Sequence, residues 1–362
     1  ELDDEATALG ARLHYIRYSR RDLLSFATGF RHLLTKRRYH AVHDHQDYSA
    51  GLHFLLGLGR LPPVRIAHVH NPAYRLVEHR TDRLSRLAGI VGKLSLRGTR
   101  ATVAGTSRQL LHEYGFRVDA SDELAPRAIY CGFDVARYCG DRERAHATLT
   151  REFGWRSADP VVLFVGRLGG DEIAAGGRSH KNPLFALDVF REAKLRCNDL
   201  RMLYVGEKGE MHTVLADIVR DNGLGDSVSF AGLRSDVPQL MLGANALLFP
   251  SSAEGLGMVA VEAQAAGLPV LASDTTPREC VVVSDLIEFV GLDQGTGHWA
   301  DRLLVMIHPP ATKHAASNAA VADSPFSIST SALELLRTYS RGLQTDKSAG
   351  LPDRPLIRRR TN

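Results

Sequence analysis

The sequence predicts an α/β protein built from two doubly wound, parallel-sheet domains. Short β-rich runs alternate with amphipathic segments along most of the chain, and this alternation restarts near residue 160. A length of 362 residues is sufficient for two sizeable cores, and 44% hydrophobic with 24% charged residues is an ordinary globular composition.

The first predicted domain covers residues 1–138. Its four strand-like runs are residues 39–45, 64–70, 101–107 and 125–134. The amphipathic segments expected to cover this sheet as helices are residues 20–37, 49–60 and 81–98. A charged stretch, residues 139–158, follows and is interpreted as a linker.

The second predicted domain covers residues 159–322, with a closing helix at 323–342 and a disordered tail at 343–362. Its strand-like runs are residues 160–168, 200–210, 227–234, 245–252, 267–274 and 286–291. Doubly wound sheets bind ligands at the carboxyl ends of their strands. The polar candidates at those ends are Gly166, Arg167, Gly206, Glu207, Arg234, Ser251 and Glu254.

A candidate anion site lies in "VGRLGGDEIAAGGRSHKN". Arg167 follows a strand directly, and Lys181 stands after a Gly-rich loop near the start of the next helix. Two cations beside the backbone N–H groups of a helix start suit a diphosphate. The alternative is a solvent-exposed loop that carries ordinary surface charges.

Two carboxylates stand in "SSAEGLGMVAVEAQAAGLPV". Glu254 lies in a polar turn, and Glu262 lies inside the following predicted helix, about 9 Å further along its axis. A buried carboxylate is costly unless it is paired. The two acids could each bind a pair of hydroxyls on either side of a diphosphate. Alternatively, Glu254 is a surface residue and Glu262 is salt-bridged to a neighbouring helix.

This stretch resembles a known family. "PSSAEGLGMVAVEAQAAGLPVLASD" is similar to the E-x7-E signature of the retaining glycosyltransferases of family 4, which have the GT-B architecture of two Rossmann-like domains facing a cleft. "VGRLGG" with "HKN" resembles their diphosphate clamp, and residues 230–252 resemble the part that covers the base. Residues 42–71 and 128–134 are similar to the first domain and hinge of exopolysaccharide-type members.

The resemblance implies roles for residues of the second domain. Glu262 would bind the ribose hydroxyls of a nucleotide-sugar, and Glu254 would contact the donor sugar. Arg167 and Lys181 would neutralise the diphosphate, and Arg234 would border the base. The remaining donor-binding positions are Gly166 beside Arg167 and the backbone of Gly255, Leu256, Gly257 and Met258.

The chemistry of transfer agrees with these roles. A nucleoside diphosphate leaves with growing negative charge, and fixed cations stabilise that charge most in the transition state. No Asp-x-Asp stands near this site, so the Arg/Lys pair is expected to replace a metal. We therefore expect no metal ligand and no cofactor, with the nucleotide-sugar as a substrate.

The first domain is expected to bind the acceptor, and it carries two H-x-H pairs, His43 with His45 and His68 with His70. On a strand, such a pair points both rings to one face. One interpretation is a metal site with Asp44 or Asp47, and the other is a set of polar residues lining the interdomain cleft. By resemblance, His70 would contact the donor sugar or polarise the acceptor, with His68 as the alternative.

Net charge and cysteine content indicate which partners and which cellular compartment to expect. A net charge of +4 is too small to indicate nucleic acid, and four scattered cysteines without C-x-x-C are typical of a reduced, cytoplasmic setting. Basic residues gather on two amphipathic segments, at Arg17, Arg20, Arg21, Arg31, Lys36, Arg37 and Arg38, and at Arg83, Arg86, Lys93, Arg97 and Arg100. They are either solvated helix faces or a peripheral docking surface for the anionic inner face of a membrane.

The expected function is retaining transfer of a hexose, from a UDP- or GDP-linked donor to a glycan or lipid-linked acceptor, in cell-surface polysaccharide assembly. Members of the family that this chain resembles begin with a strand, a Gly-rich turn, a helix and a second strand. The resemblance implies that this first β-α-β unit is absent from the chain as given. The amino-terminal domain is therefore expected to be incomplete, with an unpaired interior edge. The alternative functions are a nucleotide-sugar-binding module with little turnover and a nucleotide-sugar epimerase; the Glu254/Glu262 pair argues against the epimerase.

Overall fold

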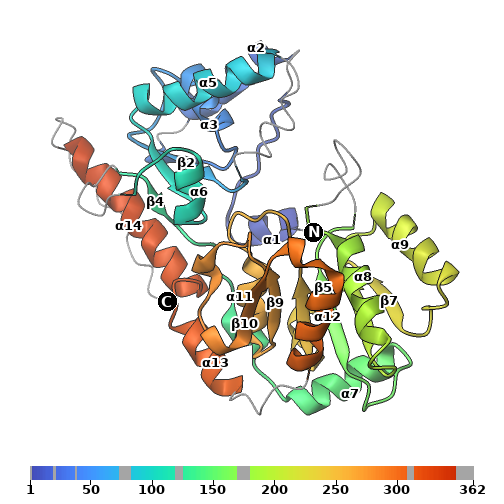
Figure 1. Ribbon diagram of the computed structural model, residues 1–362. Helices are drawn as coiled ribbons and strands as arrows, with labels where there is room; N and C mark the ends of the chain where they lie inside the picture. The colour runs from blue at the N-terminus through green and yellow to red at the C-terminus, as the bar shows by residue number, and fades with distance from the viewer. Residues whose placement is uncertain are drawn as a thin grey trace.

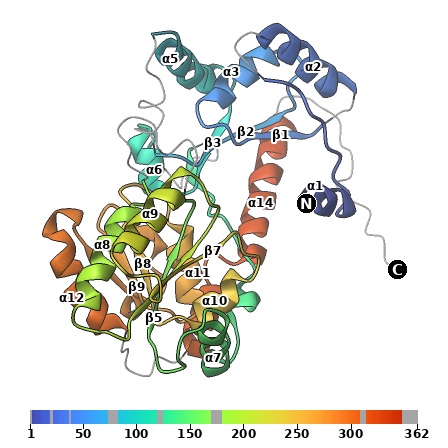
Figure 2. The same ribbon diagram turned by 90° about the vertical axis from the view of Figure 1, so that its right-hand side faces the viewer.

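The computed structural model describes residues 2–18, 22–36, 39–72, 83–118, 125–168, 180–307 and 314–347. It contains two α/β domains, and each has its own parallel sheet (Figure 1). The predicted fold class, with two Rossmann-like sheets, is confirmed. A long helix, α14 (Ile328–Lys347), runs from the second domain to the first (Figure 2).

The first domain has a four-stranded sheet in the order β1-β2-β3-β4. The strands are β1 (Ala41–Asp44), β2 (Val64–Val69), β3 (Thr102–Gly105) and β4 (Arg127–Ala128). The helices are α1 (Leu2–Ala8), α2 (Leu23–Lys36), α3 (Ser49–Leu56), α5 (Arg83–Gly98) and α6 (Arg108–Glu113). The described strands lie in the sheet in the same order as in the chain, with β1 at one edge.

The faces of this sheet are covered by different parts of the chain. On one face, Val69 and Val103 pack with Phe54 of α3, Leu96 of α5 and Leu110 of α6. On the other face, Val64 and Ile66 of β2, Ala104 of β3 and Ile129 pack against apolar residues of α14. The last described helix of the chain therefore completes the core of the first domain.

The second domain has a six-stranded sheet in the order β10-β9-β8-β5-β6-β7. The strands are β5 (Val161–Val165), β6 (Arg201–Val205), β7 (Val228–Gly232), β8 (Ala246–Phe249), β9 (Val270–Ser273) and β10 (Ile287–Val290). The chain moves outward from β5 to β7, then returns to the other side of β5 at β8. Ligands of such sheets bind at the carboxyl ends of the strands that flank this switch point.

Helices cover both faces of the second sheet. One layer consists of α8 (Pro183–Lys194), α9 (Glu210–Asp221) and α12 (Gly295–Met306). The other consists of α7 (Arg142–Glu152), α10 (Val237–Gly243), α11 (Met258–Ala265) and α13 (His314–Ala322). Short 3-10 turns complete the order, namely η1 (Val135–Tyr138), η3 (Arg278–Cys280), η4 (Ser284–Leu286) and η5 (Leu292–Gln294).

Two stretches outside the predicted strands differ from the sequence-based description. The stretch 139–158, interpreted as a linker, contains α7, whose Leu149 is buried in the core of the second domain. Arg142 anchors this helix by donating hydrogen bonds to the carbonyl oxygens of Ala266 and Ala244, at 2.7 and 2.9 Å. The closing helix expected at 323–342 is α14, which continues to Lys347, inside the expected tail; residues 348–362 lie outside the described residues.

Candidate functional site

The loops after β5 and β8 lie at the switch point of the second sheet and carry most of the predicted donor residues. Lys181 Nζ donates a 2.6 Å hydrogen bond to Glu254 Oε1, and Ser251 Oγ donates to the same oxygen at 2.6 Å. Two further bonds join the loop before α8 to the loop after β8. Ser252 N donates to the carbonyl oxygen of His180 at 2.7 Å, and Asn182 Nδ2 donates to that of Pro250 at 2.9 Å.

Glu262 lies on α11, where it is close enough to Lys181 to feel the positive charge that also pairs with Glu254. Burial raises the pKa of Glu262 to about 6, while a hydrogen bond with the Tyr138 side chain and the positive charge of Lys181 act to lower it. Lys181 therefore interacts with both predicted carboxylates. Tyr138 belongs to η1, so the segment between the two domains contributes to the surroundings of Glu262.

The Gly-x-Gly of the second domain meets two separate steric demands. A Cβ atom at Gly255 would lie 2.2 Å from the carbonyl oxygen of His70, so only glycine permits this contact between the domains. Gly257 precedes α11 with φ +90°, a backbone conformation that favours glycine. Leu256 is buried in the core between them, and Met258 begins the helix.

Hydrogen bonds join the two domains at two places, the loop that carries Glu254 and the turn η3. Ser107 Oγ donates a 2.6 Å hydrogen bond to the carbonyl oxygen of Gly255. Glu279 of η3 accepts from the backbone N–H groups of Arg108 and Gln109, at 2.9 and 2.8 Å, and from Tyr130 Oη at 2.7 Å. Neither Ser107 nor Glu279 was among the residues predicted for the site. Ser107 follows a strand as a recognisable helix N-cap, whereas no local pattern marks Glu279.

Gly166 and Arg167 directly follow β5, and the Arg167 side chain is exposed. Arg234 follows β7, at the sheet edge away from β8, and binds two other carboxylates. It donates to Glu152 at 2.6 Å and to Asp236 at 2.7 Å, and these hydrogen bonds raise the pKa of its guanidinium. The described contacts of Arg234 thus tie it to α7 rather than to Lys181 and Glu254, and its place beside the base stays a prediction.

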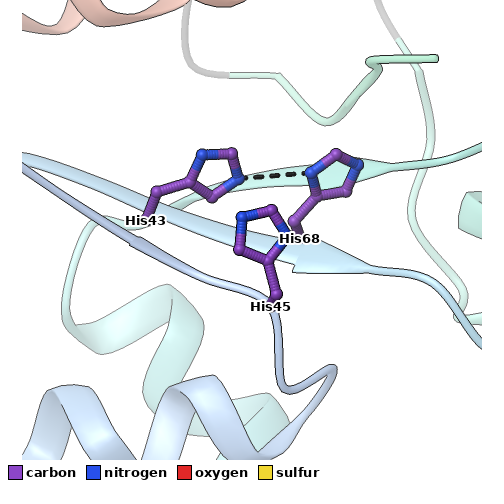
Figure 3. Close-up of side chains that lie close together, drawn as sticks. All are labelled: His43, His45 and His68. Carbon is purple, nitrogen blue, oxygen red and sulfur yellow. Dashed lines mark hydrogen bonds between the residues drawn. The ribbon is translucent and has the colours of Figure 1, made fainter. Parts of the chain in front are cut away.

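The four histidines of the H-x-H pairs lie together in the first domain. Figure 3 shows three of them, His43, His45 and His68. His43 Nε2 lies 3.2 Å from His68 Nδ1, and His45 Nδ1 lies 2.8 Å from His70 Nε2. Burial lowers the pKa of His68 to about 2 and that of His43 to about 4, and it also lowers the pKa values of His45 and His70. The imidazoles are therefore neutral near pH 7.

The carboxylates expected to complete a metal site with these pairs have other partners. Asp44 Oδ2 pairs with His53 Nδ1 at 2.7 Å. Asp47 accepts from His70 N at 2.7 Å and from Asn71 Nδ2 at 3.0 Å. The interpretation that used Asp44 or Asp47 as the third ligand is therefore wrong, because both side chains turn to neighbouring loops and helices.

The basic segments are described only in part. Arg17 pairs with Asp22, and Arg31 donates to the carbonyl oxygen of Leu58 at 2.8 Å. Arg20, Arg21, Arg37 and Arg38 lie outside the described residues, and so do the side chains of Arg83 and Arg86. Among the described helices, none combines the length and apolar content needed to cross a lipid bilayer.

The fold and the site define a class of protein. Two parallel α/β domains meet through the loops at their strand ends, and a cation–carboxylate pair lies at the switch point of the second. This is the architecture of a GT-B protein with a nucleotide-binding type of second domain.

Comparison with known proteins narrows the class. Residues 147–320 match the family described as "Glycosyl transferases group 1". The chain is 26% identical, over 326 residues, to a Bacillus subtilis (strain 168) protein named as a glycosyltransferase, EpsF (83% of this chain, 75% of that one). It is 31% identical over 257 residues to the D-inositol 3-phosphate glycosyltransferase of Nocardia farcinica, covering 67% of this chain and only 52% of that relative.

Solved structures agree on the fold. Anabaena Alr3699/HepE in complex with UDP superposes with a TM-score of 0.68 at 19% identity, covering 86% of this chain and 82% of that one. WaaG, a glycosyltransferase involved in lipopolysaccharide biosynthesis, superposes with a TM-score of 0.62 at 14% identity, covering 94% and 86%. At these identities the likeness establishes the GT-B fold.

Proposed function

We propose that this protein transfers a hexose from a nucleotide-sugar, UDP- or GDP-linked, to a glycan or lipid-linked acceptor with retention of configuration. The observation that carries the proposal is the contact of Lys181 with Glu254, beside Glu262, at the switch point of a group 1 glycosyltransferase domain. A role in cell-surface polysaccharide assembly is supported by the similarity to EpsF.

Each donor group has a candidate partner. The ammonium of Lys181 carries three donors, so it can keep its bond to Glu254 and still donate to a phosphate oxygen. Arg167, which follows β5, would also stabilise the negative charge of the leaving diphosphate. This charge grows as the glycosidic bond breaks. Glu254 would accept from sugar hydroxyls while Glu262 accepts from the ribose.

The first domain would contribute His70. Its carbonyl oxygen touches Gly255, which places the backbone of His70 next to the loop that carries Glu254. Its ring is half-buried, and its Nε2 is paired with His45 Nδ1 at 2.8 Å, so Nδ1 is the ring nitrogen that it would offer to a sugar hydroxyl. His68 is only 4% exposed, which makes it the weaker candidate for contact with a sugar.

Transfer is proposed to need neither a divalent metal nor a cofactor, because Arg167 and Lys181 supply fixed positive charge where the diphosphate would bind. Turnover would then be unchanged by EDTA. Loss of turnover in EDTA, followed by recovery in Mg²⁺ or Mn²⁺, would contradict this part of the proposal.

We place the reaction at the inner face of an anionic membrane, on the cytoplasmic side. The support is helix α5, where Ile90 and Leu94 are 57% and 62% exposed and Arg97 lies one turn further along the same face. Flotation with anionic vesicles tests this placement. Absence of binding at low salt would favour solvated helix faces instead.

The second candidate is a nucleotide-sugar-binding module with little turnover. A thermal-shift screen with a panel of nucleotide-sugars would identify the donor, and release of nucleoside diphosphate from that donor would then be measured with a glycan acceptor. Turnover supports the transferase. Stabilisation by a donor without turnover favours the binding module, and no stabilisation by any member of the panel would refute both.

A further inference from the structure

The histidine cluster of the first domain contains three imidazoles that converge on one point. His43 lies on β1, His45 is the first residue after this strand, and His68 lies on the neighbouring strand β2 (Figure 3). In the parallel register His43 pairs with Ile66, so His45 and His68, two positions further on, come side by side. We infer that His43, His45 and His68 bind one transition-metal ion of the Zn²⁺ type through three ring nitrogens.

The spacing of the nitrogens supports this site. The three candidate ligand atoms all lie within 4.8 Å of one another. In tetrahedral zinc sites with Zn–N distances of about 2.0–2.1 Å, two ligand nitrogens are about 3.4 Å apart. His43 Nε2 and His68 Nδ1 are 3.2 Å apart, which is already the edge of such a tetrahedron. A shift of at most about 1.4 Å by the ring of His45, which is exposed, would complete the three contacts.

Two of the rings are held by their other nitrogen, as in known metal sites. His43 Nδ1 lies 2.9 Å from Tyr339 Oη of α14, which leaves Nε2 to face His68. His45 Nδ1 bonds to His70, so Nε2 is the nitrogen that His45 would give to an ion. Metal-bound histidines almost always have such a second partner, which orients the ring and selects the tautomer.

The donor set indicates which ion fits. Asp44 and Asp47 bind elsewhere, so imidazole nitrogens are the ligands that the described residues offer. Imidazole suits Zn²⁺, Cu²⁺ and Ni²⁺, whereas Mg²⁺, Mn²⁺ and Ca²⁺ prefer oxygen. A neutral imidazole has one nitrogen without a proton, so each ring can offer one nitrogen to an ion when its other nitrogen carries the proton. Three protein ligands leave a fourth position for water or another small ligand.

This site is separate from the proposed donor site and does not depend on the proposed transfer reaction. An ion here would tie β1 to β2 and, through Tyr339, would strengthen their contact with α14.

Equilibrium dialysis of untagged, full-length protein against Zn²⁺, with elemental analysis, tests the site. We expect one ion per chain, a raised melting temperature, and tetrahedral absorption bands when Co²⁺ replaces Zn²⁺. His45→Ala removes an exposed ligand without opening the core and should weaken Zn²⁺ binding at least tenfold. Tyr339→Phe should weaken it about tenfold through loss of the second partner. His298→Ala, an exposed histidine of α12, is the matched control and should bind as the wild type does.

Circular dichroism establishes that each variant is folded before binding is compared. Equal Zn²⁺ affinity in wild type and His45→Ala would overturn the inference, because the ion would then sit at other histidines. Absence of bound Zn²⁺ in the wild type would overturn it as well. Preferential binding of Mg²⁺ over Zn²⁺ would refute the argument from the donor set.

Discussion

Glu262→Gln is expected to stabilise the protein at neutral pH while it weakens nucleotide binding. Burial raises the pKa of Glu262 from 4.5 to about 6, so the ionised carboxylate costs the folded state about 2 kcal/mol. Glutamine carries no charge, and its amide oxygen can still accept from Tyr138. Lys181 loses the attraction of Glu262 but keeps its bond to Glu254.

The dependence on pH follows from the direction of this change in pKa. The folded protein holds the Glu262 proton more tightly than the unfolded chain does, so the cost is absent below about pH 4.5. It grows as the pH rises through about 6 and is complete above that value. The stability advantage of Glu262→Gln should therefore be near zero at low pH and reach about 2 kcal/mol at pH 7.5.

Two measurements separate the structural effect from the functional one. Urea unfolding across this pH range reports the stability of wild type and variant, and calorimetry with a nucleoside diphosphate reports affinity. Loss of a charged hydrogen bond to ribose should cost about 1.5–3 kcal/mol, or roughly 10- to 150-fold in Kd. Glu210→Gln, an exposed carboxylate at the start of α9, is the matched control and should change neither quantity appreciably.

The outcomes distinguish the effect of Glu262 on stability from its proposed role in binding ribose. If Glu262→Gln is no more stable than wild type at pH 7.5, the argument from burial is refuted. If the variant gains stability but binds the nucleotide as tightly as wild type, the burial argument holds and the assignment of Glu262 to ribose fails.

Four further predictions concern the site and the contact between the domains. Lys181→Ala should lower kcat about 100-fold, measured as nucleotide release, because it removes a cation from the leaving group. Gly255→Ala should separate the domains, measured by solution scattering, because its Cβ would lie 2.2 Å from the carbonyl oxygen of His70; Gly225→Ala, with no neighbour within 4 Å, is the control. Glu279→Gln should lower the melting temperature by a few degrees, since the charged acceptor of two backbone N–H groups is lost. Adding Mg²⁺ or Mn²⁺ to EDTA-treated protein should leave turnover unchanged, and a rise would contradict the proposed role of the cations.

Much of the fold could be predicted from local patterns. Alternation of β-rich and amphipathic segments reports which side of each element is buried, and that is sufficient to predict two parallel α/β domains. Helix α7 was not predicted because its sequence is strongly charged, and only its contact with α10 and the core buries Leu149. The packing of α14 against the first sheet was not predicted either, because the apolar face of a helix does not specify which surface it covers.

The sequence by itself determined the fold class and the polar residues that end each strand, because both depend on neighbours along the chain. It also placed Lys181 and Glu254 in one candidate site, and the structure brings them into contact. Only the tertiary structure decided the convergence of three imidazoles, the fit of Gly255 against His70 and the bonds of Glu279 across the domains. These contacts depend on strand order, register and the orientation of two separate domains. Such long-range geometry arises from packing of the whole chain, and no local spacing of residues encodes it.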